Sequence, residues 1–159
     1  MYQIDFNKPQ HIYFMGIGGI SMSGLAEILM DEGFTISGSD SKESELTEHL
    51  RSRGAFVSIG QRAENIAAAD EAGGAVDAVV YTAAIHPDNP EFQAAQQAGI
   101  PMMSRAVLLG EMMRNYKEAI AVSGTHGKTT TTSMLSMILM ESQKDPTISV
   151  GGILPEIGG

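Results

Sequence analysis

The stretch HIYFMGIGGISMSG, residues 11–24, joins a mostly apolar run to a glycine-rich loop and then to a helical pattern. The run 11–15 has the length and composition of a strand that is buried on both faces of a sheet. Apolar residues then recur at helical spacing, at Ile20, Leu25, Ile28 and Leu29. Gly33 follows as a helix stop, so a helix is predicted over 19–32. This order predicts the first strand–loop–helix unit of a parallel sheet.

The same alternation continues along the chain. Further strands are predicted at 34–40, 55–60, 77–85, 100–104, 118–124 and 147–152. Further helices are predicted at 43–54, 90–99, 105–115 and 130–142. We therefore predict an α/β fold, in which a Rossmann-like, doubly wound parallel sheet carries helices on both faces and is followed by a P-loop strand–loop–helix. Ligands of such sheets bind at the carboxyl ends of the strands.

Composition limits the partners of this chain. The 159 residues have a formal net charge of −9 and no cysteine. Nucleic acid is not an expected partner, because phosphate binding needs clustered Lys and Arg. A disulfide framework and a thiolate metal site are excluded. No apolar run approaches the ~18 residues of a membrane span, and the start of the chain lacks a signal-peptide pattern, so we expect a soluble cytoplasmic protein without a membrane partner.

The loop after the first predicted strand partly matches the dinucleotide fingerprint G-x-G-x-x-G. Gly16 and Gly18 fit the pattern, Ser21 stands at the third glycine position, and Gly19 adds one more residue without a Cβ. Glycines at these places let the backbone approach a diphosphate, and the helix N-terminus offers free N–H groups to it. The loop alone is compatible with NAD, FAD or a UDP-sugar.

Asp40 ends the second predicted strand, 22 residues after Gly18. An acidic side chain at this place meets ribose hydroxyls in doubly wound nucleotide sites. Its alternative role is to cap the helix that is predicted to begin at Glu43. The glycine loop beside it favours the nucleotide contact.

The stretch GTHGKTTTTS, residues 124–133, is a second and more specific phosphate loop. Gly127, Lys128 and Thr129 supply the G-K-T end of a Walker A motif, between a predicted strand and a predicted helix. Lys128 is placed to reach the β- and γ-phosphates of ATP, and Thr129 is placed to bind Mg²⁺ through its hydroxyl. The match is incomplete, because Val122 stands at the first Walker glycine. A plain turn into a helix is the alternative.

With two predicted nucleotide loops, the chain resembles the Mur ligases of peptidoglycan synthesis. The matching stretches are HIYFMGIGGISMSGLAEIL, GSD, AENI, AIHPDNPE, SRAVLLGEMMR and AVSGTHGKTTTTSM. The resemblance implies a UDP-sugar-binding domain at 1–115 and a truncated, N-terminal part of an ATP-binding central domain at 116–159. It also implies that ATP activates the carboxylate of UDP-N-acetylmuramate as an acyl phosphate, which L-alanine then attacks. This chain by itself is expected to be inactive.

The resemblance assigns roles to residues of both loops. Contacts to the UDP-sugar are expected from Gly16, Gly18, Gly19, Ile20, Ser21, Asp40, Thr82, Ala83, Ala84 and Arg105. Contacts to ATP are expected from Gly124, Thr125, His126, Gly127, Lys128, Thr129 and Thr130. Lys128 and Thr129 are the expected catalytic residues, and Thr129 is the expected Mg²⁺ ligand. Gln61 stands where the family pattern has a His, and its amide could still bond to uracil or ribose.

Two alternatives remain open at this point. A ligase that attaches recycled murein peptides to the same nucleotide sugar would share both loops. An NAD-binding regulatory module would need the first loop alone. A separate expectation concerns the helix after Lys128, which carries the apolar residues Met134, Leu135, Ile138 and Leu139. These should pack on the first domain or on another chain, and self-association is therefore expected.

Overall fold

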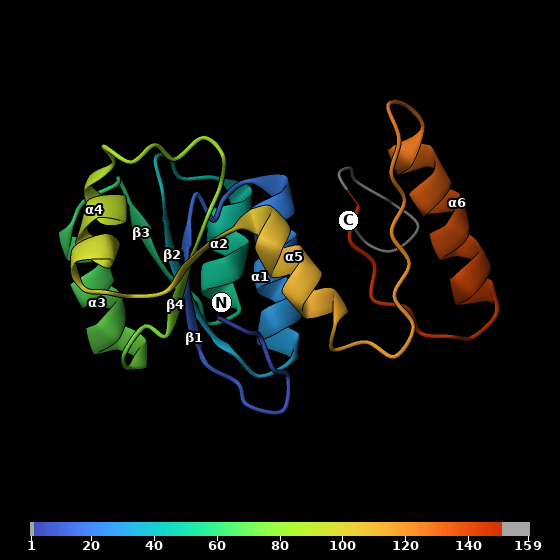
Figure 1. The fold of residues 1–159 in the computed structure, drawn as a ribbon, viewed down its shortest axis with the longest axis horizontal. Coiled ribbons are helices and arrows are strands. Elements are labelled where there is room, and N and C mark those ends of the chain that lie inside the picture. The colour runs from blue at the N-terminus through green and yellow to red at the C-terminus, as the bar shows by residue number, and fades with distance from the viewer. Residues whose placement is uncertain (1, 151–159) are drawn as a thin grey trace. The chain divides into compact units, whose positions relative to one another are not determined.

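The computed structural model of the protein describes residues 2–150, which form two compact units (Figure 1). The first unit is Met1–Lys117 and the second is Glu118–Gly159. The first unit holds a five-stranded, all-parallel sheet with the strand order β3-β2-β1-β4-β5. The strands are β1 (His11–Met15), β2 (Thr35–Asp40), β3 (Phe56–Ile59), β4 (Ala78–Tyr81) and β5 (Met102–Ser104). The predicted Rossmann-like α/β sheet is confirmed.

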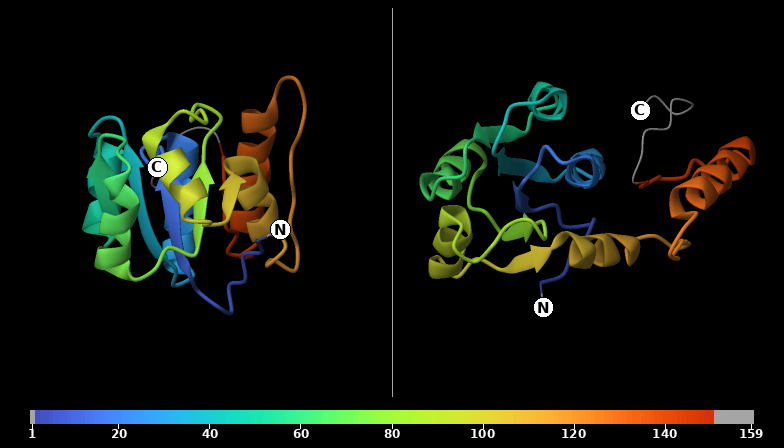
Figure 2. Two further views of the ribbon diagram at one scale, coloured as in Figure 1. Left: turned by 60° about the vertical axis from the view of Figure 1, so that its left-hand side comes forward. Right: turned by 90° about the horizontal axis from the view of Figure 1, so that it is seen from above.

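Helices cover both faces of this sheet, as Figure 2 shows. The helices of the first unit are α1 (Ile20–Asp31), α2 (Glu45–Ser52), α3 (Glu64–Gly73), α4 (Pro90–Gln97) and α5 (Arg105–Met113). The larger apolar cluster draws its residues from α1, α2 and α5, and the smaller one from α3 and α4. The chain therefore changes face between β3 and β4, which makes the sheet doubly wound.

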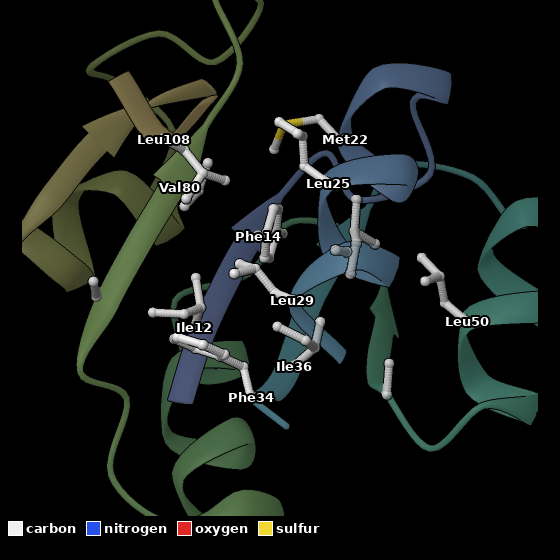
Figure 3. Packing of buried hydrophobic residues seen from close by; sticks show 14 of the residues in the cluster. Ile12, Phe14, Met22, Leu25, Leu29, Phe34, Ile36, Leu50, Val80 and Leu108 are labelled. Carbon is white, nitrogen blue, oxygen red and sulfur yellow. The ribbon is translucent and has the colours of Figure 1, made fainter. Parts of the chain in front are cut away.

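The central strand β1 shows why the sheet is buried on both faces. Successive side chains of a strand point to opposite faces. Ile12 and Phe14 accordingly pack with Leu29 in the larger cluster (Figure 3), whereas Tyr13 and Met15 lie in the smaller one. The strand side chains Ile12, Tyr13, Phe14 and Met15 are fully buried. Burial of each contributes about 1.5–3 kcal/mol to folding, which favours the strand over any other local structure.

The helix ends follow local sequence signals. Ser44 and Thr47 form a capping box at the start of α2, with the Thr47 N–H donating to the Ser44 hydroxyl at 3.3 Å. Asn89 caps α4, in which Pro90 is the first residue. The predicted helix stops Gly33 and Gly54 have φ of 86° and 104°, a left-handed conformation that glycine adopts without strain.

Helix α3 was not predicted from the sequence. Its N-cap position is Ala63, whose side chain forms no capping hydrogen bond, so the usual start signal is missing. Its body, ENIAAADEAG, is alanine-rich and favours a helix. Ile66 and Ala69 bury the inner face of the helix in the smaller apolar cluster.

The second unit contains helix α6 (Lys128–Glu141), which confirms the helix that was predicted over 130–142. The strand predicted at 118–124 is wrong, because these residues form no strand. The part of the predicted strand 147–152 that is described, residues 147–150, is not a strand either, and residues 151–152 lie outside the described part. A strand needs backbone partners, and the described residues of this unit offer no other strand to pair with.

No helix within residues 2–150 is both long enough and apolar enough to cross a membrane.

Candidate nucleotide site

The candidate site lies at the carboxyl ends of β1 and β4, where the strand order of the sheet reverses. The chain leaves β1 toward α1 on one face and leaves β4 toward α4 on the other. Doubly wound sheets bind ligands at this switch point. Gly16 follows β1 with φ of 82°, and a Cβ on it would lie 3.4 Å from Cγ2 of Thr82, which follows β4. The structure thus places two of the predicted site residues side by side.

The loop before α1 leaves two backbone donors free. The N–H groups of Gly16 and Ile17 both donate to the Ser39 carbonyl, at 2.8 and 2.9 Å. Within residues 2–150, the N–H groups of Ile20 and Ser21 have no acceptor, because they belong to the first turn of α1. The preceding N-cap residue is a glycine with no side chain to cap them. Such free N–H groups and the positive end of the helix dipole favour an anion.

Asp40 holds this loop in place. Its Oδ2 accepts the Gly18 N–H at 2.9 Å, and its Oδ1 accepts the Lys42 N–H at 3.3 Å. The alternative role as cap of α2 is wrong, because Ser44 is the N-cap of that helix. A Cβ on Gly18 would lie 2.9 Å from both Asp40 Oδ2 and Thr47 Cγ2. A side chain at position 18 would therefore displace the Asp40 carboxylate or the Thr47 side chain.

Arg105 joins the loop from the far end of the sheet. It is the first residue of α5, and its Nη1 donates to the Ser21 hydroxyl at 2.9 Å, across 84 residues of sequence. Arg51, Arg53 and Arg114 have carboxylates within 4.0 Å, whereas Arg105, like Arg62, has none among the described residues. A half-buried guanidinium without a carboxylate partner, next to free backbone N–H groups, suits a diphosphate.

The remaining predicted contacts differ in their placement. The Thr82 hydroxyl accepts the Ala84 N–H at 3.3 Å and closes the turn after β4. Ala83 and Ala84 are exposed on this turn. Ile20 exposes 59% of its surface at the start of α1, although large apolar residues are normally buried. The roles of these residues toward a UDP-sugar stay predictions.

A buried polar network around Glu91, which the sequence did not predict, lies next to the site. Glu91 of α4 is fully buried, and it accepts hydrogen bonds from the Tyr13 hydroxyl at 3.3 Å and the Ser39 hydroxyl at 2.6 Å. It also accepts from the Arg62 N–H at 3.3 Å and from Nδ2 of Asn65. Four donors thus satisfy one buried carboxylate. These hydrogen bonds link β1, β2, α4 and the loop before α3, and no local sequence pattern predicts them.

The second predicted phosphate loop leads into the predicted helix α6, although no strand directly precedes it within the described residues. Gly127 has φ of 79° and precedes Lys128, the first residue of α6. Nζ of Lys128 donates to the carbonyls of Gly124 and Thr125, at 2.7 and 3.4 Å. In the described part of the chain, the N–H groups of Lys128, Thr129 and Thr130 have no acceptor. The loop can therefore offer an anion a helix N-terminus and an ammonium group.

Thr129 is the one residue that the sequence predicts as an Mg²⁺ ligand. The Thr129 hydroxyl is exposed and forms no hydrogen bond with residues 2–150. That part of the chain contains no group of three or more His, Asp or Glu residues that could hold a metal ion. A hydroxyl fits Mg²⁺ chemistry as one oxygen ligand, but Mg²⁺ takes six ligands. His126 is likewise exposed, and its contact with ATP stays a prediction.

Comparison with known proteins decides the family. A family model described as "Mur ligase family, catalytic domain" matches residues 11–117. The chain belongs to the Mur ligase family. It is 66% identical, over all of its residues, to a UDP-N-acetylmuramate–L-alanine ligase of Agathobacter rectalis, and it covers 33% of that protein.

Solved structures of Mur ligases share this fold. The UDP-N-acetylmuramate–alanine ligase of Thermotoga maritima matches 92% of the chain with 35% identity and a TM-score of 0.81, over 33% of its own length. A murein peptide ligase of Psychrobacter arcticus matches 84% of the chain with 30% identity and a TM-score of 0.72, over 27% of its length. The chain thus spans about a third of the length of the Mur ligases that it resembles.

The Glu91 network of this Mur ligase chain predicts a pH dependence of stability. Burial, and then the charge of Glu91, raise the pKa of Tyr13 above the ordinary value of 10. A raised pKa in the folded state stabilises the fold below pH 10, and this stabilisation is lost as the pH rises above 10. The free energy of unfolding should then fall by up to about 1.4 kcal/mol per pH unit on account of Tyr13.

Urea denaturation of the wild type and of Tyr13→Phe, at pH values from 8 to 11, measures this effect. At pH 8 the variant should be less stable by about 1 kcal/mol, because it lacks the hydrogen bond to Glu91. The difference should shrink as the pH rises above 10. Parallel curves for the two proteins over the whole range would contradict the prediction.

Proposed function

We propose that this chain is the UDP-N-acetylmuramate-binding part, with the start of the ATP-binding part, of a ligase that joins L-alanine to UDP-N-acetylmuramate. The observation that carries the proposal is the contact of Arg105 with Ser21, which brings a guanidinium to the free N–H groups of α1. The names of the most similar relatives support the choice of nucleotide sugar and amino acid.

The first unit would hold the UDP end of the substrate. The N–H groups of Ile20 and Ser21 and the guanidinium of Arg105 would bind the diphosphate, since all are donors that have no carboxylate or carbonyl partner within residues 2–150. Oδ2 of Asp40 accepts the Gly18 N–H, and Oδ1 of Asp40 would accept a ribose hydroxyl. Thr82 would line the site opposite the glycine loop, and Ala83 and Ala84 would extend this wall.

The second loop would hold the phosphates of ATP. Bound ATP supplies the phosphoryl group that activates the muramyl carboxylate, and Mg²⁺ supplies charge neutralisation. Lys128 would exchange its bonds to the Gly124 and Thr125 carbonyls for phosphate oxygens. The N–H groups of Thr129 and Thr130 would orient the same phosphates, and the Thr129 hydroxyl would be one Mg²⁺ ligand. We expect no amide formation by this chain alone, because the described residues hold no complete metal site.

Both alternatives are less well supported. Among solved structures, an L-alanine ligase matches with 35% identity and a TM-score of 0.81, against 30–34% and 0.72–0.73 for two murein peptide ligases. Relatives at 52% to 66% identity are named UDP-N-acetylmuramate–L-alanine ligase. An NAD-binding module would not need the second phosphate loop, and membership in the Mur ligase family favours a ligase. A cytoplasmic location, where ATP and nucleotide sugars are available, belongs to the proposal.

Self-association through α6 also stays a prediction. Met134 and Ile138 expose 63% and 64% of their surfaces, and Met137 and Met140 are exposed as well. Leu135 and Leu139 are half-buried. An exposed apolar stripe of this kind favours contact with another protein surface.

Replacing Arg105 by alanine tests the proposed diphosphate site. The variant should bind UDP about 10-fold more weakly, because a charge-assisted hydrogen bond contributes about 1.5–3 kcal/mol and partial exposure reduces this value. Its affinity should also depend less on salt concentration. Isothermal titration calorimetry at two salt concentrations measures both effects.

Arg114→Ala is the matched control, since Arg114 pairs with Glu111 at 3.0 Å and lies at the far end of α5. The control should bind UDP as the wild type does. Equal UDP affinity of Arg105→Ala and the control would rule out the role of Arg105. Heat of binding with NADH and none with UDP would overturn the proposed function itself.

A further inference from the structure

The glycine loop before α1 begins on a single backbone carbonyl of β2. The N–H groups of Gly16 and Ile17 both donate to the Ser39 carbonyl, at 2.8 and 2.9 Å. The position of this carbonyl therefore determines where the loop starts. The hydroxyl of Ser39 donates in turn to Oε2 of Glu91 at 2.6 Å, and both side chains are fully buried. A buried carboxylate thus fixes the residue that supports the loop.

A second series of hydrogen bonds joins Glu91 to the middle of the same loop. Nδ2 of Asn65 donates to Oε1 of Glu91 and also to the Gly60 carbonyl, the latter at 2.7 Å. The Gly60 N–H donates to the Asp40 carbonyl at 2.8 Å, and Oδ2 of Asp40 accepts the Gly18 N–H at 2.9 Å. The start and the middle of the glycine loop are therefore linked to one carboxylate by two separate routes.

The surroundings of Glu91 require a carboxylate. Its two oxygens accept from four donors, which belong to Tyr13, Ser39, Arg62 and Asn65. A carboxylate has acceptors only, whereas a glutamine would set an NH₂ group against at least one of these donors. Glu91 is also the second residue of α4, so the positive end of that helix dipole stabilises its charge.

We propose that Glu91 is a positioning residue of the UDP-sugar site, which holds the glycine loop in the shape that binds a diphosphate. Its side chain is fully buried, so it acts on the ligand through Ser39 and Asn65. A loop that is ordered in advance loses little conformational entropy when a ligand binds. This inference rests on the proposed UDP-sugar site, and it adds the residue that orders the loop.

Two substitutions break the link between Glu91 and the loop. Ser39→Ala removes the hydroxyl and keeps the backbone carbonyl that the loop needs. Glu91→Gln keeps the size of the side chain and loses one acceptor. It also removes a negative charge, which by itself would favour an anionic ligand. Weaker UDP binding by Glu91→Gln would therefore have the opposite sign to a pure charge effect.

Ile66→Ala is the matched control for lost stability. Ile66 packs in the smaller apolar cluster together with Tyr13, and its side chain belongs to no hydrogen bond of the network. Truncating a buried isoleucine is among the costlier core substitutions, so the control tests whether instability alone weakens binding. Thermal unfolding without nucleotide shows whether each variant is folded at the temperature of the binding experiment.

Calorimetry with UDP on the 159-residue chain measures the affinity of the folded variants. Ser39→Ala and Glu91→Gln should each bind UDP about 10-fold more weakly than the wild type. The double variant should lose little more than either single variant, because both substitutions remove the same link. Ile66→Ala should bind UDP as the wild type does.

Amide hydrogen exchange separates the positioning of the loop from the stability of the fold. Amides at a strand end exchange by local opening, whereas those in a central strand exchange by global unfolding. The Gly16 and Ile17 amides should exchange about 10-fold faster in Ser39→Ala and in Glu91→Gln. In Ile66→Ala, the amide of Phe14 in the central strand should exchange faster, and the two loop amides should keep their wild-type rates.

Each outcome has a definite meaning. Weaker UDP binding with faster loop exchange in both variants, and neither effect in the control, supports the inference. Wild-type affinity in either folded variant, an equal loss in the control, or weaker binding without faster loop exchange overturns the role of Glu91 and leaves the proposed function standing. A wild type that binds no UDP overturns the proposed function and this inference with it. If Glu91→Gln does not fold, Ser39→Ala decides by the same criteria.

Discussion

Replacing Gly18 by alanine should reduce UDP affinity by about 30- to 100-fold while the protein stays folded. The new Cβ would lie 2.9 Å from Asp40 Oδ2 and 2.9 Å from Thr47 Cγ2, and real Cβ contacts are not this short. The Asp40 carboxylate would have to leave the Gly18 N–H, so both the glycine loop and the ribose contact would lose their positions. Calorimetry with UDP measures the loss.

Gly24→Ala is the control for this substitution. Gly24 lies in α1, six residues after Gly18, and a Cβ there would meet no atom within 4 Å. Alanine should therefore leave UDP binding unchanged and raise the free energy of unfolding by about 0.5–1 kcal/mol, as in other helix interiors. Wild-type UDP affinity in Gly18→Ala would mean that the loop adapts, and the assigned roles of Gly18 and Asp40 would then be wrong.

Gly38→Ala should have the largest effect on stability, with a loss of about 3 kcal/mol or more in the free energy of unfolding. Gly38 of β2 pairs with Phe14 of β1 in the centre of the sheet. A Cβ on Gly38 would lie 2.4 Å from the Phe14 carbonyl oxygen and 3.0 Å from Cδ1 of Ile17. The backbone of β1 is paired on both sides, so neither strand can move away without breaking ladder hydrogen bonds.

Urea denaturation of the wild type, Gly38→Ala and Gly110→Ala measures this effect. Gly110 lies in α5, and a Cβ there would meet no atom within 4 Å, so the control should be at least as stable as the wild type. If Gly38→Ala is too unstable to purify, the same comparison can be made by the yield of folded protein at low temperature. A denaturation midpoint equal to that of the wild type would contradict the predicted clash.

Most strands and helices of the first unit could be predicted from the sequence because their signals are local. The continuous apolar run of β1, the stops at Gly33 and Gly54 and the Asn-Pro start of α4 each act within a few residues. Helix α3 was missed for the same reason, because its first turn has no capping side chain. The strand expected at 118–124 was wrong, since strand formation depends on a partner that no local pattern reveals.

Some features of the candidate site could likewise be predicted from local sequence, and others could not. The two glycine loops could be read directly, because a phosphate needs backbone N–H groups and small residues at close spacing. Arg105 was named only through family resemblance, and its bond to Ser21 lies outside any motif. The capping residue Asn89 could have been recognised from the Asn-Pro pair, whereas its bond to Gln61 could not.

The sequence by itself predicted the α/β class, most strands and helices of the first unit, the two glycine-rich loops and the family resemblance, because hydrophobic period, helix ends and glycine spacing are properties of neighbouring residues. Only the tertiary structure decided that Asp40 holds Gly18, that Arg105 reaches Ser21 and that Glu91 holds Ser39. These pairs are 22, 84 and 52 residues apart, and the parallel sheet alone brings them to one edge. Hydrogen bonds depend on distance in space, which the spacing of residues along the chain does not specify.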